Sequence, residues 1–480
     1  MIVYLPLRRD EMIGNIESLF WGRLLTKHEI EIQLGQIIKE NEAFWQNFER
    51  IPAIKEENGH YQCSRCNNSS EQLFAWIDDN RFHQERRYYC LNCLNMGRMI
   101  EGEDLFYLAS RHKENLIPNG QQEFITWQGT LSPEQERASQ ELIESLSDPG
   151  IPHLVHAVTG AGKTEMIFPL INEVLKQGGR ICIASPRIDV CLELYPRLKE
   201  AFKGVDMTLL YGASEEAYKY SPIVIATSHQ LLRFCQAFDV LVMDEVDAFP
   251  FVNDPYLHVA AEKSVHQSSG KVVYLTATPD DRLIRQINNH EIKVTTLPAR
   301  FHGYPLPVPK FMWIGDWKNQ IQRRKKSGKL WRHLMGFIQG PGVKLIFMPD
   351  IRLAESLFNW MLQQELPYKF ACVHSKDLER KEKVQALKQG DLDFLISTTI
   401  LERGVTFTHC HVTIIGAEDA NFSRSALVQM SGRVGRKKEF PRGHLFYSHF
   451  GQSKAMKAAK AEIISMNSLA QTKGLIRSED

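Results

Sequence analysis

The chain has 480 residues, and 58 Lys and Arg face 57 Asp and Glu, which gives a formal net charge of +1. This length exceeds what one hydrophobic core supports and predicts about three domains, while the near-neutral charge excludes a basic field over the whole surface. No apolar run approaches the roughly 18 residues that cross a membrane, and the N-terminus does not have the order of a signal peptide, so an intracellular protein is expected.

In chain order, residues 1–55 form a mixed, helix-leaning region of unknown role, and 56–118 form a cysteine-rich module. Residues 125–297 and 298–480 each alternate short apolar runs with helical patterns, which is typical of parallel strands buried on both faces. The stretch Leu297–Pro309, with prolines at alternate positions from Pro305 onward, indicates a connector between the two series. The predicted fold class is α/β, with two tandem domains that each contain a parallel sheet. The predicted strands are His153–Val158, Arg180–Ala184, Ile223–Thr227, Val240–Met243, Val272–Leu275, Val343–Met348, Phe370–Val373, Phe394–Ser397 and His411–Ile415.

The cysteine-rich module contains two Cys-x₂-Cys pairs, Cys63 with Cys66 and Cys90 with Cys93. Two such pairs suit a closed tetrahedral site of four thiolates around Zn²⁺, whose role would be structural because no coordination position is open. Iron–sulfur ligation, which uses other spacings, is the second interpretation. The scattered cysteines are expected to be buried thiols. They are Cys182, Cys191, Cys235, Cys372 and Cys410.

Aromatic and basic side chains are interleaved around the cysteine pairs. They are Phe74, Trp76, Arg81, Arg86, Arg87, Tyr88, Tyr89 and Arg98. Bases of single-stranded nucleic acid stack on aromatic rings, so nucleic-acid contact is one interpretation. The other is that a small metal-bound fold needs these rings for its core and carries the arginines as ordinary surface residues.

The segment AVTGAGKT, Ala157–Thr164, lies between a predicted strand and the helical pattern Glu165–Lys176. Strand, glycine loop and helix in this order predict a phosphate-binding loop. Lys163 would reach the β- and γ-phosphates, and the Thr164 hydroxyl would coordinate Mg²⁺. The backbone that would surround the phosphates belongs to Thr159, Gly160, Ala161 and Gly162.

Two carboxylates, Asp244 and Glu245, follow the predicted strand Val240–Met243. Carboxylates at the carboxyl end of a strand in a phosphate-loop fold lie beside the nucleotide. Asp244 would hold Mg²⁺, and Glu245 would orient or deprotonate the attacking water. An acidic turn after a strand is the alternative, but the order of the two motifs along the chain favours the catalytic interpretation.

The second α/β domain contains QMSGRVGR, Gln429–Arg436. Arg433 and Arg436 are three residues apart and would share one face if a helix began here. An arginine at the γ-phosphoryl group stabilises the charge that develops during transfer. A basic turn that binds the phosphates of a polymer is the alternative, and the two arginines need not share one role.

Seven segments in this order resemble the motifs of superfamily 2 helicases and translocases: AVTGAGKTE, ASPR, ATSHQ, DEVD, TAT, STTILERGV and QMSGRVGR. The resemblance covers roughly Leu131–His449 and implies two RecA-like lobes with ATP in the cleft. It also implies that Gln135 reads adenine, with Gln140 nearby, and that Gln429 contacts the nucleotide. A track for the nucleic-acid backbone is implied at Pro186, Arg187, Thr227, Thr398, Arg403 and Gly404. Such contacts give affinity without sequence preference, as a motor requires.

Within the superfamily, the four-cysteine module before the motor, together with HAVTGAGKTEMIF and DEVDAFP, resembles the ComFA family of late-competence ATPases. This resemblance implies ATP-driven import of single-stranded DNA from the cytoplasmic face of the membrane. The implied partners are single-stranded DNA, the membrane DNA channel and late-competence proteins that include a phosphoribosyltransferase-like protein. Self-association to a homo-oligomer is a further expected interaction.

Two other functions stay open. The lobe motifs also resemble the PriA group, in which cysteine clusters interrupt the second lobe, so a replication or repair helicase is one alternative. The other is an ATP-binding nucleic-acid scaffold that does not turn over. The presence of Lys163, Asp244, Glu245 and both arginines argues against the scaffold.

Overall fold

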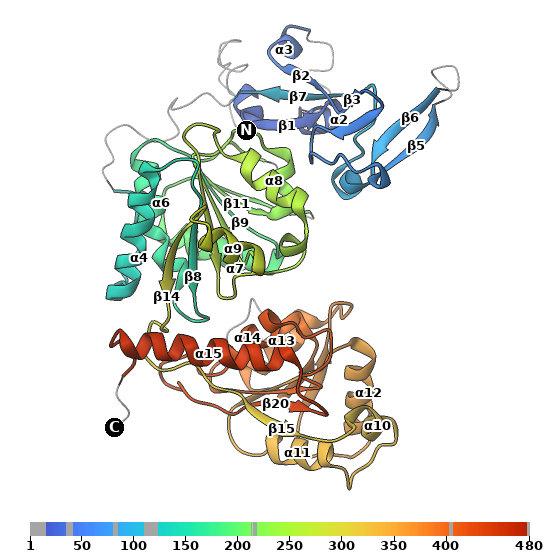
Figure 1. Ribbon diagram of the computed structural model, residues 1–480, viewed down its shortest axis with the longest axis vertical. Helices are drawn as coiled ribbons and strands as arrows, with labels where there is room; N and C mark the ends of the chain where they lie inside the picture. The colour runs from blue at the N-terminus through green and yellow to red at the C-terminus, as the bar shows by residue number, and fades with distance from the viewer. Residues whose placement is uncertain are drawn as a thin grey trace, which may run out of the picture. The chain divides into compact units, whose positions relative to one another are not determined.

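The computed structural model describes residues 16–34, 42–79, 85–109, 123–212, 214, 218–402 and 407–477 (Figure 1). Contacts divide the chain into two compact units, Met1–Val155 with Thr164–Thr295 and His156–Lys163 with Thr296–Asp480. Each large sheet is parallel in the strand pairs that are described, so the predicted α/β fold with two tandem lobes is confirmed. No helix among the described residues is long and apolar enough to cross a membrane.

The first unit begins with a small module that combines the N-terminal region and the cysteine-rich segment. Its described strands form an antiparallel sheet in the order β1 (Arg23–Thr26), β7 (Asp104–Leu108) and β2 (Glu49–Pro52). Because β7 comes from the cysteine-rich segment and lies between two strands from residues 1–55, the two segments fold together. We call this unit the N-terminal module. Its other elements are η1 (Ser18–Phe20), α2 (Lys27–Leu34), α3 (Glu42–Gln46), the hairpin β3 (Ile54–Glu57) and β4 (His60–Cys63), η3 (Glu71–Leu73), the hairpin β5 (Phe74–Asp79) and β6 (Glu85–Cys90), and η5 (Leu91–Met96).

The large sheet of the first unit has the described strand order β10-β11-β9-β12-β13-β8-β14. Its strands are β8 (His153–Ala157), β9 (Ile181–Ser185), β10 (Met207–Leu210), β11 (Ile223–Thr227), β12 (Val240–Asp244), β13 (Lys271–Thr276) and β14 (Lys293–Leu297). The predicted strands of this lobe all form, with ends that agree within one residue. The two strands that the sequence did not indicate, β10 and β14, are the edge strands, and β14 is only partly buried, so its apolar pattern is weaker.

Helices lie on both sides of this sheet (Figure 1). They are α4 (Pro133–Glu144), α5 (Lys163–Met166), α6 (Phe168–Lys176), α7 (Ile188–Ala201), α8 (Pro255–Ser264) and α9 (Asp281–Asn288), with 3₁₀ helices η6 (Ser145–Ser147), η7 (Ser228–Arg233) and η8 (Phe251–Asn253). The predicted helix Glu165–Lys176 is interrupted at Ile167. Pro169 has no backbone N–H, which is tolerated in the first turn of α6 but not in the interior of a continuous helix.

The large sheet of the second unit has the described order β15-β20-β19-β16-β18-β17, and its described pairs are all parallel. Its strands are β15 (Lys310–Trp313), β16 (Val343–Phe347), β17 (Phe370–Val373), β18 (Phe394–Ser397), β19 (Cys410–Ile415) and β20 (Leu445–His449). The sequence predicted β16 to β19 and did not indicate β15 or β20. The helices are α10 (Trp317–Gln322), α11 (Lys329–Ile338), α12 (Ile351–Leu362), α13 (Arg380–Gln389), η9 (Thr399–Leu401), α14 (Arg424–Ser431) and α15 (Lys454–Thr472).

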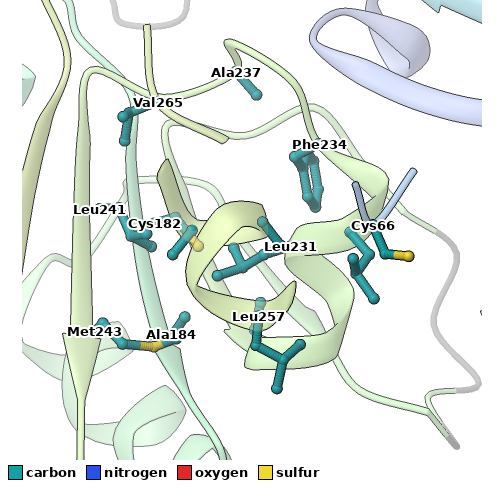
Figure 2. Packing of buried hydrophobic residues seen from close by; sticks show 14 of the residues in the cluster. Cys66, Cys182, Ala184, Leu231, Phe234, Ala237, Leu241, Met243, Leu257 and Val265 are labelled. Atoms are coloured by element: carbon teal, nitrogen blue, oxygen red, sulfur yellow. The ribbon is translucent and has the colours of Figure 1, made fainter. Parts of the chain in front are cut away.

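The N-terminal module shares a hydrophobic core with the first lobe. The buried cluster that contains the four paired cysteines also contains Leu231, Phe234 and Leu257 of the lobe. Figure 2 shows Cys66 near these three side chains. The backbones meet at Gly22, whose carbonyl accepts a hydrogen bond from the Cys235 N–H at 2.9 Å. A Cβ at Gly22 would lie 2.6 Å from the Ala237 Cβ, and φ there is +69°, so only glycine suits this approach. The module is therefore part of the first lobe's core rather than a domain on a tether.

Candidate functional site

The phosphate-loop segment has the backbone that its glycines predict. Gly160 and Gly162 have φ of +83° and +79°, and the Ala161 N–H donates to the Val158 carbonyl at 3.1 Å. Side chains with a Cβ rarely adopt these angles, so the two glycines are required for the turn. Helix α5 begins at Lys163, directly after the loop. The local order of strand, tight turn and helix N-terminus is the one that binds phosphate.

The acidic pair lies at the end of a buried strand, as predicted. Asp244 is the last residue of β12 and is level with Leu275 of β13, and β13 alone separates β12 from β8 in the sheet. Glu245 has φ of +55°, an uncommon angle for a residue other than glycine, and its N–H donates to the Asp244 carboxylate at 2.8 Å. Strained backbone of this kind is found where a side chain must be held in a functional position.

Asp247 is a residue of this site that the sequence argument missed. Its carboxylate accepts hydrogen bonds from the hydroxyl groups of Thr276, at 2.7 Å, and of Thr278, and both threonines are buried. Asp247 thus ties the loop after Asp244 and Glu245 to the end of β13. The signal was present in the motifs DEVD and TAT, but the hydrogen bonds that join them are visible only in the folded chain.

Gln135 occupies the third position of a capping box at the start of α4. Its Oε1 accepts from the Ser132 N–H at 2.9 Å, and its own N–H donates to Ser132 Oγ at 3.4 Å. The sequence Ser-Pro-x-Gln specifies this cap, which gives Gln135 a structural role that we did not predict. Gln135 is buried, whereas Gln140 is exposed on the same helix. Adenine recognition by Gln135 stays a prediction.

The two arginines of the second lobe do not lie at a helix start, so the condition for their sharing one helical face is not met. Helix α14, which contains Gln429, ends at Ser431, and Arg433 and Arg436 follow its C-terminus in a turn. A left-handed glycine, Gly435 with φ +69°, sits between them and ends the helical path. Arg433 is 1% exposed, and its Nε donates to the Glu402 carbonyl at 3.1 Å.

Arg300, in the predicted connector, supports that turn and was also missed. Its guanidinium donates to the carbonyls of Val434, at 2.8 Å, and Gly435, at 2.6 Å. Burial lowers the pKa of Arg300 to about 9, with the neighbouring charge of Arg436 acting in the same direction. An arginine in a proline-rich segment gives no local signal for this role, because its partners are more than a hundred residues away.

The predicted backbone track is partly assembled within each lobe. In the first lobe, Ser185 and Thr227 are level in the neighbouring parallel strands β9 and β11, so Pro186 and Arg187 leave the sheet beside Thr227. Arg187 is the N-cap residue of α7, and Thr227 is the N-cap residue of η7. In the second lobe, Thr398 follows β18 and is the N-cap residue of η9. Arg403 and Gly404 lie outside the described residues.

The four paired cysteines converge on one buried point. Cys63 Sγ lies 3.8 Å from Cys93 Sγ, and Cys66 Sγ lies 3.6 Å from Cys90 Sγ. All four sulfurs are within 4.8 Å of one another. Four thiolates about 2.3 Å from a central Zn²⁺ would be about 3.8 Å apart, so these donors fit one zinc ion and leave no room for a cluster of several irons.

The surroundings of the sulfurs also suit a bound cation. Four thiolates this close together repel one another, so holding all four deprotonated requires a positive charge at the centre. Asn68 Nδ2 lies 3.8 Å from Cys90 Sγ and provides a polar neighbour to that sulfur.

The aromatic face beside the metal site is partly exposed. Trp76 is 47% exposed, and the Arg86 guanidinium lies over its ring at 4.2 Å from the centroid. Tyr61 and Tyr88 pack with their ring centroids 4.3 Å apart and their planes tilted by 31°. These rings could stack on bases, but they also pack on each other, so both predicted interpretations stay open. Arg81 lies outside the described residues.

An ion-pair bridge that the sequence did not reveal links the metal site to the lobe. Glu29 of α2 pairs with Arg65, between the first two cysteines, and with Arg233, at the end of η7, where Arg233 Nε lies 2.7 Å from Glu29 Oε1. Burial opposes ionisation of Glu29, but the charges of Arg65 and Arg233 outweigh it and lower its pKa to about 2. The carboxylate is therefore charged at neutral pH and holds both arginines.

Known families match the chain along most of its length. The N-terminal domain of competence protein ComFA matches residues 10–107, the DEAD/DEAH box helicase domain 132–287, and the helicase conserved C-terminal domain 329–438. The chain is 42% identical over 410 residues to the competence protein ComFA of Bacillus subtilis (strain 168). The aligned region covers 85% of this chain and 86% of that protein. The chain is 40% identical over 449 residues to ComFA of Streptococcus pneumoniae (strain ATCC BAA-255 / R6), which covers 93% and 98%. The chain belongs to the ComFA family of competence proteins.

The resemblance to ComFA, and to superfamily 2 helicases, is thus confirmed. Among solved structures, this ComFA-family chain resembles Saccharomyces cerevisiae Dbp5 bound to RNA and ADP BeF3, with a TM-score of 0.50 and 16% identity over 70% of this chain and 91% of that chain. At that identity the likeness shows the fold alone. The helicase domains make the ComFA-family chain a superfamily 2 ATPase, imply ATP, Mg²⁺ and nucleic-acid binding, and support a competence-related DNA helicase or translocase role.

Proposed function

We propose that this protein is a single-stranded DNA translocase that uses ATP to power the import of transforming DNA during competence. The observation that carries the proposal is that β9 pairs with both β11 and β12. Arg187, which follows β9, therefore lies beside Thr227 at the end of β11, and the neighbouring strand β12 ends at Asp244. Backbone-binding groups and a nucleotide-site carboxylate then share one rigid support. Membership of the ComFA family supplies the biological setting.

Each residue has a distinct part in the proposed cycle. Lys163 binds the terminal phosphates, and Glu245 orients or deprotonates the attacking water. Thr164 and Asp244 would hold Mg²⁺, which neutralises phosphate charge when bound. Arg433 and Arg436 stabilise the charge that develops on the transferred group. Nucleotide contacts from Gln135 and Gln429 complete the site.

The remaining assignments belong to the same proposal. Zn²⁺ bound by the four cysteines stabilises the N-terminal module, in keeping with a closed Cys₄ site. The DNA strand runs over Pro186, Arg187 and Thr227 of the first lobe and over Thr398, Arg403 and Gly404 of the second. The motor works at the cytoplasmic face of the membrane with the DNA channel and other late-competence proteins, including a phosphoribosyltransferase-like partner, and self-associates there.

ATP hydrolysis measured with and without single-stranded DNA tests the motor. We expect stimulation of the wild type and a loss of about 10³-fold or more in Lys163→Ala, because the lysine contacts the transferred phosphoryl group. Lys176→Ala is the matched control, since Lys176 lies on α6 of the same lobe and pairs with Glu123 at the surface. The scaffold would be supported instead if single-stranded DNA did not change ATP hydrolysis by the wild type and if Lys163→Ala hydrolysed ATP at the wild-type rate.

Strand displacement separates a translocase from a replication or repair helicase. We expect movement along single strands with little unwinding of a duplex. Efficient unwinding of a forked duplex would favour the helicase.

Binding to single-stranded DNA should also weaken steeply as the salt concentration rises, because contacts to the DNA backbone release counterions. An affinity that does not change with salt would contradict the proposed track.

A further inference from the structure

We propose that the N-terminal module is a metal-dependent brace for the segment that follows Thr227, and that Glu29 and Arg233 are the positioning residues that transmit it. Bound Zn²⁺ would then set how well the first lobe holds single-stranded DNA, without any contact between the metal and ATP. The inference deepens the proposed function and rests on it, because it assigns a regulator to the proposed track.

The first link is the ion-pair bridge of Glu29, Arg65 and Arg233. Arg65 is fully buried, and it also donates to the Met96 carbonyl at 3.1 Å. Arg233 donates to the same carbonyl at 3.4 Å. Met96 lies three residues after Cys93, and Arg65 lies between Cys63 and Cys66. One carboxylate and one carbonyl therefore join both cysteine pairs to the end of η7.

The second link runs through α8, which packs against η7. Asn68, the neighbour of Cys90 Sγ, accepts from the Tyr256 hydroxyl at 2.9 Å. The Lys263 ammonium donates to the Ser64 carbonyl at 2.7 Å, and burial lowers its pKa. Both α8 residues thus bond to the loop that carries the first cysteine pair. Leaving these partly buried donors unpaired would be costly, so the contacts hold α8 and η7 against the folded module.

The braced segment begins at a residue of the proposed track. Thr227 ends β11 and occupies the N-cap position of η7, and Arg233 is the last residue of that 3₁₀ helix. A 3₁₀ helix has few internal hydrogen bonds, so its position depends on what packs against it. At one end it continues from strand β11, and at its other end the Arg233 side chain is held by Glu29 and by the Met96 carbonyl of the N-terminal module. Loss of the metal would free that end and allow Thr227 to move.

Hydrogen exchange and DNA-stimulated ATP hydrolysis of Arg233→Met test the brace. We expect the protein to keep its zinc and its hydrolysis without DNA. Amide exchange should rise over 228–233, and the DNA concentration for half-maximal stimulation should rise about tenfold, the size of one lost charged hydrogen bond. Arg233→Lys keeps the charge opposite Glu29 and should recover part of the loss.

Arg424→Met is the matched control, because it breaks an ion pair of similar burial in the other unit. The side chains of Arg424 and Glu462 are 29% and 12% exposed, against 25% and 17% for Arg233 and Glu29. We expect its amide exchange over 228–233 and its DNA concentration for half-maximal stimulation to match those of the wild type. Should Arg233→Met fail to fold, Glu29→Gln takes its place, since the amide keeps the shape and an acceptor oxygen.

Zinc removal completes the cycle. Chelation of zinc from the wild type should raise the DNA concentration for half-maximal stimulation as Arg233→Met does. Chelation of the variant should add little, because metal loss and the substitution both release the end of η7. Additive effects, or an unchanged DNA concentration for half-maximal stimulation in Arg233→Met, would overturn the brace. A wild type without DNA stimulation would instead overturn the proposed function, while increased exchange over 228–233 in the variant would still support the mechanical link.

Discussion

The two lobes contain the same local device with different supports. In the first, Thr227 ends β11 and is the N-cap residue of the 3₁₀ helix η7, and in the second, Thr398 follows β18 and is the N-cap residue of the 3₁₀ helix η9. The end of η7 is held by Arg233, Glu29 and the N-terminal module. The end of η9 is held within its own unit, where Arg433 donates to the carbonyl of Glu402.

This difference teaches that equivalent strand ends can be controlled by unrelated parts of a chain. Behind η9 stands Arg433, a residue proposed to act at the phosphates, so that support belongs to the ATP cycle. The support behind η7 belongs to the module that contains the four-cysteine site. In our proposal the first lobe therefore has an additional, metal-dependent control, and its counterpart has none among the described contacts.

The largest effect should come from Cys90→Ser. Structural zinc sites contribute on the order of 10 kcal/mol to folding, so a module that lacks one of its four thiolates should lose its zinc and its fold. Amide exchange should then rise over 228–233 but not over 399–402. Cys235→Ser, which removes a thiol outside the metal set, is the control. Unchanged exchange over 228–233 in zinc-free protein would show that the two lobes are supported alike.

Arg433→Ala should break the other support. We expect a loss of about 10³-fold in DNA-stimulated hydrolysis, because an arginine at the transferred phosphoryl group contributes that much. Exchange should rise over 399–402, while zinc content and exchange over 228–233 stay at wild-type values. Arg323→Ala, in the exposed turn after α10, is the control. A coupled rise over 228–233 would mean that the two supports are not independent.

Gly22→Ala probes how closely the module must approach the lobe. Gly59→Ala is a matched control, because Gly59 also has a positive φ, of +79°, but nothing lies within 4 Å of the position that a Cβ would take there. Both substitutions carry the backbone cost of a left-handed angle. Only Gly22→Ala adds the clash with Ala237, which should cost about 1–3 kcal/mol more and is measured by thermal unfolding. Equal losses would show that the junction is loosely packed.

Acid should affect both lobes and so contrasts with zinc removal. Burial lowers the pKa of His258, in the first lobe, and of His333, in the second, to about 4 from an ordinary value near 6.5. Between those values the unfolded chain binds the proton and the folded chain does not, so stability falls as pH drops from 6.5 towards 4. His258→Gln and His333→Gln should each reduce this loss in thermal unfolding followed between pH 7 and pH 5. An unaltered pH dependence in both variants would assign the acid sensitivity to other groups.

Much of the fold was accessible from the sequence because its signals are local. Buried parallel strands such as β11 and β16 are short continuous apolar runs, and they were located within a residue. Edge strands such as β14 and β15 receive less burial, so their composition is less distinctive. The three-residue spacing of Arg433 and Arg436 would put them on one face only if a helix began there, whereas α14 has already ended at Ser431 and Gly435 turns the chain between them.

The sequence by itself determined the chemistry of the sites: the glycine turn before Lys163, the carboxylates after β12 and the spacing of the four cysteines. These follow from residue type and from neighbours a few positions away. Only the tertiary structure decided what holds those sites. The contacts of Glu29 with Arg233, of Asp247 with Thr278 and of Arg300 with Gly435 join residues far apart in the chain, and charged or hydroxyl groups at isolated positions do not specify their partners. Burial makes those partners necessary, and burial is a property of the folded chain.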